Sequence, residues 1–126
     1  MMNNMGDPRT LVLPRISYMG NMQIDNSRPD TIYLDVVGSN ARATIYDATK
    51  PGQFIVKMSL IGSYDENTQG IALKQVVHLP IIPLIFNGVV FSMPNSPRIS
   101  IFGTVKRGFF SGDAKRWQAS LVPIPR

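Results

Sequence analysis

The sequence lacks cysteine altogether and contains a single histidine, His78. The absence of cysteine excludes disulfide bonds, thiolate metal sites, iron–sulfur clusters and thiol nucleophiles. One histidine is too few for a histidine-rich metal site, and a serine-histidine-aspartate triad would need His78 as its base. Because no nucleophile-elbow motif accompanies it, we interpret His78 as a hydrogen-bonded structural residue.

Carboxylates are also scarce, with one glutamate, Glu66, and seven aspartates. The aspartates are scattered through turn-like contexts, and no pair recurs at a spacing that suits general acid–base catalysis. We therefore expect a protein that is not an enzyme and that binds no cofactor or metal.

Long uninterrupted segments are missing as well. The longest stretch without glycine or proline, Ser39 to Lys50, has 12 residues, which excludes long helices. No apolar run is long enough to span a membrane, and the methionine-rich start lacks the pattern of a signal peptide. We expect a soluble, unexported protein with no membrane partner.

What the sequence does contain is β-branched and aromatic residues that alternate with polar ones between turn residues, which is the pattern of strands. The 126 residues suit one domain. The predicted strands are 31–37, 41–47, 53–61, 71–79, 84–86, 89–93, 98–105 and a last one that begins at Trp117 and is ended by Pro123. The segment 71–79 fits two turns of helix about as well, and we favour the strand. About eight short strands predict an all-β, single-domain β-sandwich of jelly-roll or Greek-key type, ahead of a closed barrel.

Three segments between these strands carry specific expectations. Asn87-Gly88 predicts a tight type I′ hairpin turn. The polar stretch Gly62 to Gly70 predicts an exposed loop. The run Leu79 to Met93 is too apolar to be solvated on both faces, so we favour a buried strand pair over an oligomer interface.

The N-terminal region differs from the rest because it holds five of the seven methionines. These are Met1, Met2, Met5, Met19 and Met22. Unbranched methionine side chains adapt to irregular surfaces. We predict that residues 1–22 form an extended arm that docks onto another chain, with an unstructured leader as the alternative, and that residues 23–126 form the β-sandwich domain.

The net charge of +5 lies entirely near the C-terminus, since residues 1–97 balance and residues 98–126 carry six basic residues against Asp113 alone. Within this region the hairpin 106–117 combines basic pairs with aromatic rings. Its candidate contact residues are Lys106, Arg107, Phe109, Phe110, Lys115 and Arg116. Such a hairpin suits a nucleic-acid surface, a partner-protein contact or a solvated loop, and we favour the last two. Trp117 begins an alternating strand and is predicted to lie in the core.

From Phe54 onward the order of strands and turns forms a recognisable series. An alternating strand ends in the acidic loop Ser63-Tyr64-Asp65-Glu66-Asn67, and a valine-rich strand then leads into Leu79-Pro80. A glycine-centred turn follows and leads into Phe91-Ser92-Met93-Pro94. The strand 98–105 comes next, before a Gly-Phe-Phe-Ser-Gly hairpin, and the series closes with Ala119-Ser120-Leu121-Val122. Over roughly residues 31–123, this order resembles the small jelly-roll cement, or decoration, proteins of tailed bacteriophage heads.

The resemblance implies a non-catalytic virion protein, made in the host cytoplasm, that binds the outer capsid surface and clamps neighbouring major capsid proteins together. Exposed sandwich edges would favour a homo-oligomer, a dimer or trimer. The alternative from another class is a small nucleic-acid-binding β-domain that uses the basic C-terminal third. The two differ in salt response, because phosphate binding weakens steeply as salt is added.

Overall fold

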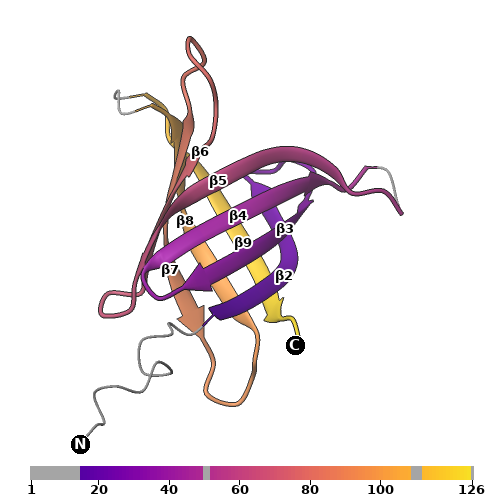
Figure 1. The fold of residues 1–126 in the computed structure, drawn as a ribbon, viewed down its shortest axis with the longest axis vertical. Helices are drawn as coiled ribbons and strands as arrows, with labels where there is room; N and C mark the ends of the chain where they lie inside the picture. The colour runs from indigo at the N-terminus through magenta and orange to yellow at the C-terminus, as the bar shows by residue number, and fades with distance from the viewer. Residues whose placement is uncertain (1–14, 50–51, 109–111, 126) are drawn as a thin grey trace, which may run out of the picture.

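The protein is a closed antiparallel β-barrel in a computed structural model that describes residues 15–49, 52–108 and 112–125 (Figure 1). Its strands are β2 (Arg15–Ile24), β3 (Asp30–Val37), β4 (Asn40–Asp47), β5 (Ile55–Asp65), β6 (Gly70–Gln75), β7 (Leu84–Ser92), β8 (Ile99–Arg107) and β9 (Lys115–Pro123). Each strand pairs with its neighbours in sequence, and β2 pairs with β9 to close the sheet. Within the described ranges, no helix is long and apolar enough to cross a membrane.

The all-β class and the number of strands agree with the sequence-based prediction, but the predicted sandwich is wrong. In jelly-roll and Greek-key folds, some strands form hydrogen-bonded pairs with strands that are not consecutive with them in sequence. In residues 15–125 every pairing joins consecutive strands except the closing one, so the sheet is a simple meander. Alternating burial is common to both architectures, because either fold hides one face of each strand.

Side chains on the inner face of the sheet fill the barrel. Phe86 and Leu121 have no exposed surface, and Trp117 is 2% exposed, as predicted for a core residue. The Phe86 and Trp117 rings meet edge to face, with centroids 5.3 Å apart. Eight strands enclose an interior just wide enough for side chains to fill. The barrel interior is therefore the hydrophobic core, and the outer wall and the loops are the surfaces available to partners.

The predicted arm does not extend to residue 22, because residues 15–24 form the first strand of the barrel. Met22 is 3% exposed and belongs to the core, whereas Met19 alternates onto the outer face opposite Tyr33 and Val122. The reason is the alternation of Tyr18, Met22 and Ile24 with polar neighbours, which is a strand pattern. Met1, Met2 and Met5 lie outside the described residues.

The predicted Asn87-Gly88 turn is also wrong, because both residues lie in the middle of β7. Gly88 faces Gly103 across the β7–β8 ladder, and a Cβ on Gly88 would lie 3.2 Å from the Trp117 ring. A Cβ on Gly103 would lie 1.8 Å from the Asn87 carbonyl oxygen. That oxygen accepts a hydrogen bond from Trp117 Nε1 at 3.0 Å. The glycines thus admit a large ring and a close backbone approach instead of a turn.

Two further segments differ from expectation. Strand β5 continues to Asp65, so the predicted loop at residues 62–70 is reduced to the β5–β6 turn. Residues 79–93 are not a buried strand pair, since they divide into an exposed connection before β7 and the single strand β7 itself. Prolines at positions 80 and 83 remove backbone donors, which prevents regular pairing there.

We expect Gly103→Ala to lower the free energy of unfolding by about 3 kcal/mol or to prevent folding, because its methyl group would overlap the backbone of β7. The matched control is Gly112→Ala, where an added Cβ meets no atom within 4 Å. Urea unfolding of both variants measures the effect. Equal stabilities would show that the strands do not approach each other this closely.

Candidate functional site

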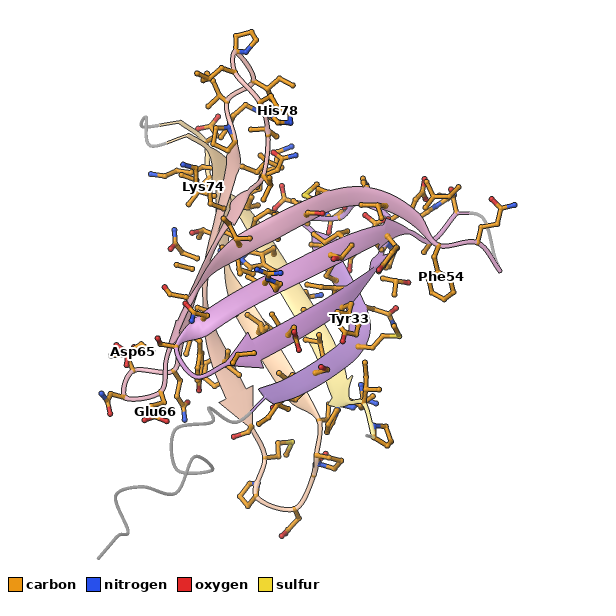
Figure 2. The ribbon with its side chains drawn as sticks, in the orientation of Figure 1. Tyr33, Phe54, Asp65, Glu66, Lys74 and His78 are labelled. Carbon is orange, nitrogen blue, oxygen red and sulfur yellow. The ribbon has the colours of Figure 1, made fainter. Side chains whose placement is uncertain are left out.

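The connections between antiparallel neighbours alternate between the two ends of the barrel. The connections β2–β3, β4–β5, β6–β7 and β8–β9 share one end, and β3–β4, β5–β6 and β7–β8 share the other. Residues 76–83, here called the β6–β7 loop, extend beyond the barrel at the first of these ends (Figure 1). The acidic pair Asp65 and Glu66 lies on the β5–β6 turn, far from His78 on the β6–β7 loop (Figure 2).

The β6–β7 loop presents large apolar side chains to solvent. Leu79 is 94% exposed, and Val76, Ile81 and Ile82 are each about half exposed. His78 is exposed among them, and its carbonyl oxygen accepts a hydrogen bond from Ile81 N–H at 3.0 Å. A contiguous group of exposed aliphatic side chains is typical of a surface that contacts a partner.

Hydrogen bonds from the barrel hold this loop in place. The Arg107 guanidinium donates to the Ile82 carbonyl oxygen at 2.7 Å, and Gly108 N–H donates to the Pro83 carbonyl oxygen at 2.8 Å. At the base of the loop, Leu84 N–H donates to the Gln75 side-chain oxygen at 3.0 Å. The predicted contact residue Arg107 therefore positions the apolar loop, a role that the sequence analysis did not assign to it.

The other predicted basic residues lie on β8 and β9, where Arg116 shares the outer face with Lys106, diagonally across the β8–β9 ladder. Lys115 and Arg116 are exposed on β9, opposite Val105 and Thr104. The Arg116 backbone N–H donates to an Asp25 carboxylate oxygen at 2.9 Å. Lys106 also lies in line with cations from β4 and β6, and Phe109 and Phe110 lie outside the described residues.

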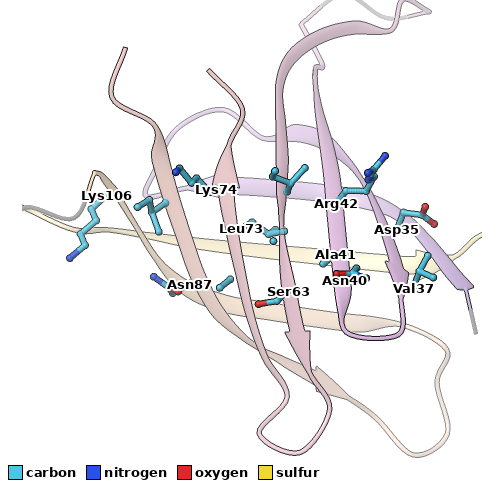
Figure 3. Close-up of a pocket in the computed structure, with 14 residues that line it drawn as sticks. Asp35, Val37, Asn40, Ala41, Arg42, Ser63, Leu73, Lys74, Asn87 and Lys106 are labelled. Atoms are coloured by element: carbon cyan, nitrogen blue, oxygen red, sulfur yellow. The ribbon is translucent and has the colours of Figure 1, made fainter. Parts of the chain in front are cut away.

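A groove of about 1010 Å³ runs across the outer wall of the barrel (Figure 3). Residues from β3 to β8 line it, with Arg42, Lys74 and Lys106 as its cations and Asp35 as its carboxylate. Three cations and one carboxylate give it a formal charge of +2. The Asp35 carboxylate is buried and accepts a hydrogen bond from the Ser17 hydroxyl at 2.7 Å.

The register of the sheet places the three cations in one line. Arg42 is opposite Ile61, Ile61 is opposite Lys74, Lys74 is opposite Ile85, and Ile85 is opposite Lys106. Cations and isoleucines therefore alternate from strand to strand across the outer wall. We call this line the cation row.

The sequence analysis named Lys106 but missed the rest of this groove and the apolar loop. The partners of Lys106 lie in regions of balanced charge, and only the register brings them together. The loop did carry a local signal, because two isoleucines bounded by Pro80 and Pro83 cannot enter a regular strand and must lie outside the sheet.

The titratable side chains of the described residues include Tyr18, whose pKa is shifted. Among them, no group of three or more histidine, cysteine, aspartate or glutamate residues is arranged to hold a metal ion. Burial raises the pKa of the Tyr18 hydroxyl above its ordinary value of 10.0, and Tyr64 raises this pKa further.

Comparison of the chain with protein-family models, with curated proteins and with solved structures gives no match.

We expect Arg107→Ala to increase hydrogen exchange of the Ile81 amide about fivefold, because loss of a charged, solvent-exposed hydrogen bond removes roughly 1 kcal/mol of local stability. Arg116→Ala is the control, since its backbone and not its guanidinium makes the contact with Asp25. Exchange followed by mass spectrometry measures both variants. Unchanged protection of residues 76–83 in Arg107→Ala would contradict the positioning role.

Proposed function

We propose that this chain is a non-catalytic structural protein that docks its β6–β7 loop into an apolar cleft of a partner protein. We further propose that the partner is the major capsid protein of a bacteriophage, whose outer surface the chain decorates. The loop geometry supports the docking role. The choice of a capsid is supported only by the sequence resemblance, and two of its features, the glycine-centred turn and most of the acidic loop, are replaced by strand in the structure. The barrel architecture differs from the jelly roll of that resemblance and does not contribute to this choice.

The observation that carries the proposal is the exposure of Leu79, with Val76, Ile81 and Ile82 beside it. Burying a leucine-sized side chain contributes about 1.5–3 kcal/mol relative to leaving it in water. In the isolated barrel Leu79 gains almost nothing from that term, and the other three side chains gain only about half of it. Contact with an apolar cleft would recover the rest, so the loop would gain from a partner.

The hydrogen bonds from Arg107, Gly108 and Gln75 make the loop more effective as a docking element. Ordering a flexible loop on binding costs conformational entropy, and a loop that is already ordered avoids much of that cost. The chain therefore presents its apolar side chains in a largely preformed arrangement.

A decoration protein can function with a modest affinity at each site. A symmetric shell offers many equivalent sites, and each copy that bridges neighbouring subunits adds to the resistance of the whole shell. Self-association into a dimer or trimer remains part of the proposal. However, barrel closure leaves no unpaired sheet edge, so the edge-based argument for self-association no longer applies.

The alternative function, nucleic-acid binding through the basic C-terminal third, is supported by the cation row, which contains Lys106. Two features weigh against it. Arg107 is engaged with the loop, and Lys115 and Arg116 lie on β9, which contributes no residue to the groove.

We expect the double variant Leu79→Ser, Ile81→Ser to bind capsids from the native source about 100-fold more weakly than the wild-type chain, since two aliphatic contacts would be lost. Its free energy of unfolding should change by less than about 0.5 kcal/mol, because both side chains are exposed. Co-sedimentation with capsids lacking the chain measures binding.

The matched control is Met93→Ser, whose side chain is 70% exposed at the opposite end of the barrel and should leave capsid binding unchanged. Equal binding by the double variant and the wild type would contradict the loop contact. Binding of the wild type to vesicles of anionic phospholipid, with no binding to capsids, would assign the loop to a lipid surface and overturn the proposal.

A further inference from the structure

We propose that the groove on the outer wall binds an extended acidic segment of a partner protein, with carboxylates at about every third residue. This inference rests on the proposed function only in taking the partner to be a protein. It concerns a second surface, on the barrel wall and not on the β6–β7 loop, and the residues that line it differ from those of the loop.

Charge is the first argument for an acidic ligand. Arg42 and Lys74 are exposed and Lys106 is partly exposed, so all three can reach a bound molecule (Figure 3). The one carboxylate that lines the groove, Asp35, stands at the end of the row opposite Arg42 and is already bonded to Ser17. A ligand that lies between Arg42 and Lys106 therefore meets positive charge along its length.

The spacing of the cations defines the ligand further. Adjacent strands lie about 4.8 Å apart, so cations on alternate strands are roughly 9.6 Å apart along the row. A polyproline II segment has three residues per turn and a rise of about 3.1 Å per residue, so every third side chain returns to the same face after about 9.3 Å. Carboxylates at every third residue would face Arg42, Lys74 and Lys106 in turn.

The residues between and beside the cations suit a polypeptide. Ile61 and Ile85 separate the cations, and Ile61, which is 52% exposed, offers an apolar contact to the side chains between carboxylates. A second line of the outer wall places Asn40 opposite Ser63 and, beyond Ala72, Asn87 on β7 (Figure 3). Amide and hydroxyl groups can pair with the backbone of a polyproline II segment, which makes no internal hydrogen bonds.

The same lining weighs against single-stranded nucleic acid. Proteins that bind it combine a cationic groove with aromatic side chains on which bases stack. The described residues that line this groove include no aromatic side chain. Isoleucine, alanine and valine stand at the positions where stacking rings would be needed.

The test uses fluorescence anisotropy with the full chain and three labelled probes. The first is a peptide of about ten residues, long enough to cross the row, with glutamate at every third position and proline and alanine between. The second has the same composition with its glutamates clustered at one end, and the third is oligothymidylate of similar length. We expect the regularly spaced peptide to bind at least about tenfold more tightly than either other probe.

Lys74→Glu, at the centre of the row, should weaken binding of the spaced peptide about tenfold. Arg28→Glu, an exposed cation on the β2–β3 connection and outside the groove, should change it less than about twofold, and Lys74→Gln should give an intermediate loss. The Leu79→Ser, Ile81→Ser variant should bind the peptide as the wild type does. This last result would show that the groove and the loop act separately, because a variant whose loop no longer docks would still bind the peptide in the groove.

Several outcomes would overturn the proposal. They are absence of peptide binding by the wild type, equal binding of the spaced and clustered peptides, tighter binding of oligothymidylate, and wild-type affinity in Lys74→Glu. Tighter binding of oligothymidylate that is lost in Lys74→Glu would assign the groove to nucleic acid instead.

Discussion

The close packing of side chains inside the barrel is the constraint on which the rest of this molecule depends. An eight-stranded barrel leaves room for either a packed core or one small ligand. Here Phe86, Trp117 and Leu121 are among the side chains that occupy that room. Recognition must then take place on the outer wall or at the loops. Both surfaces discussed here, the β6–β7 loop and the groove, are outside the barrel for that reason.

The packing around Trp117 shows how the core and the sheet determine each other. Gly88 leaves space for the indole ring, Gly103 allows β8 to approach β7, and the Asn87 carbonyl oxygen accepts the indole N–H. The close approach of β7 and β8 also affects the outer wall, because Asn87 on β7 and Lys106 on β8 both line the groove. The shape of the outer surface therefore depends on small residues that face inward.

The sequence predicts the all-β class well because β-branched residues and period-two alternation are local properties. Strand β8 illustrates this, since the sequence predicts a strand over 98–105, and β8 spans Ile99–Arg107 with Ile99, Ile101 and Val105 buried on one face. The count of eight strands was correct partly because two errors cancelled. The first strand was taken for part of an arm, whereas Asn87-Gly88 divided β7 into two predicted strands. Alternation also shows that one face of a strand is buried without showing what covers that face. The strands of a sandwich and of a barrel therefore have the same sequence pattern.

The two candidate surfaces are harder to predict, and the groove in particular arises from register and not from a local pattern. Arg42, Lys74 and Lys106 are separated by about thirty residues each along the chain, and a one-residue shift in any ladder would point one of them into the core. The basic C-terminal hairpin is predicted as a contact surface because its charged residues are adjacent in sequence. In the structure its residues make separate contacts: Arg107 donates a hydrogen bond to the β6–β7 loop, and Lys106 lines the groove.

The pairing of β2 with β9 has a mechanical consequence. In an open sheet an edge strand can peel away by breaking one ladder of hydrogen bonds, but every strand here is held by two. A force that pulls the chain through the β6–β7 loop meets β6 and β7, and each of them is bonded on both sides. A contact made by a few exposed aliphatic side chains is weaker than two such ladders. If the loop docks as proposed, the protein would therefore detach whole under load, still folded and able to bind again.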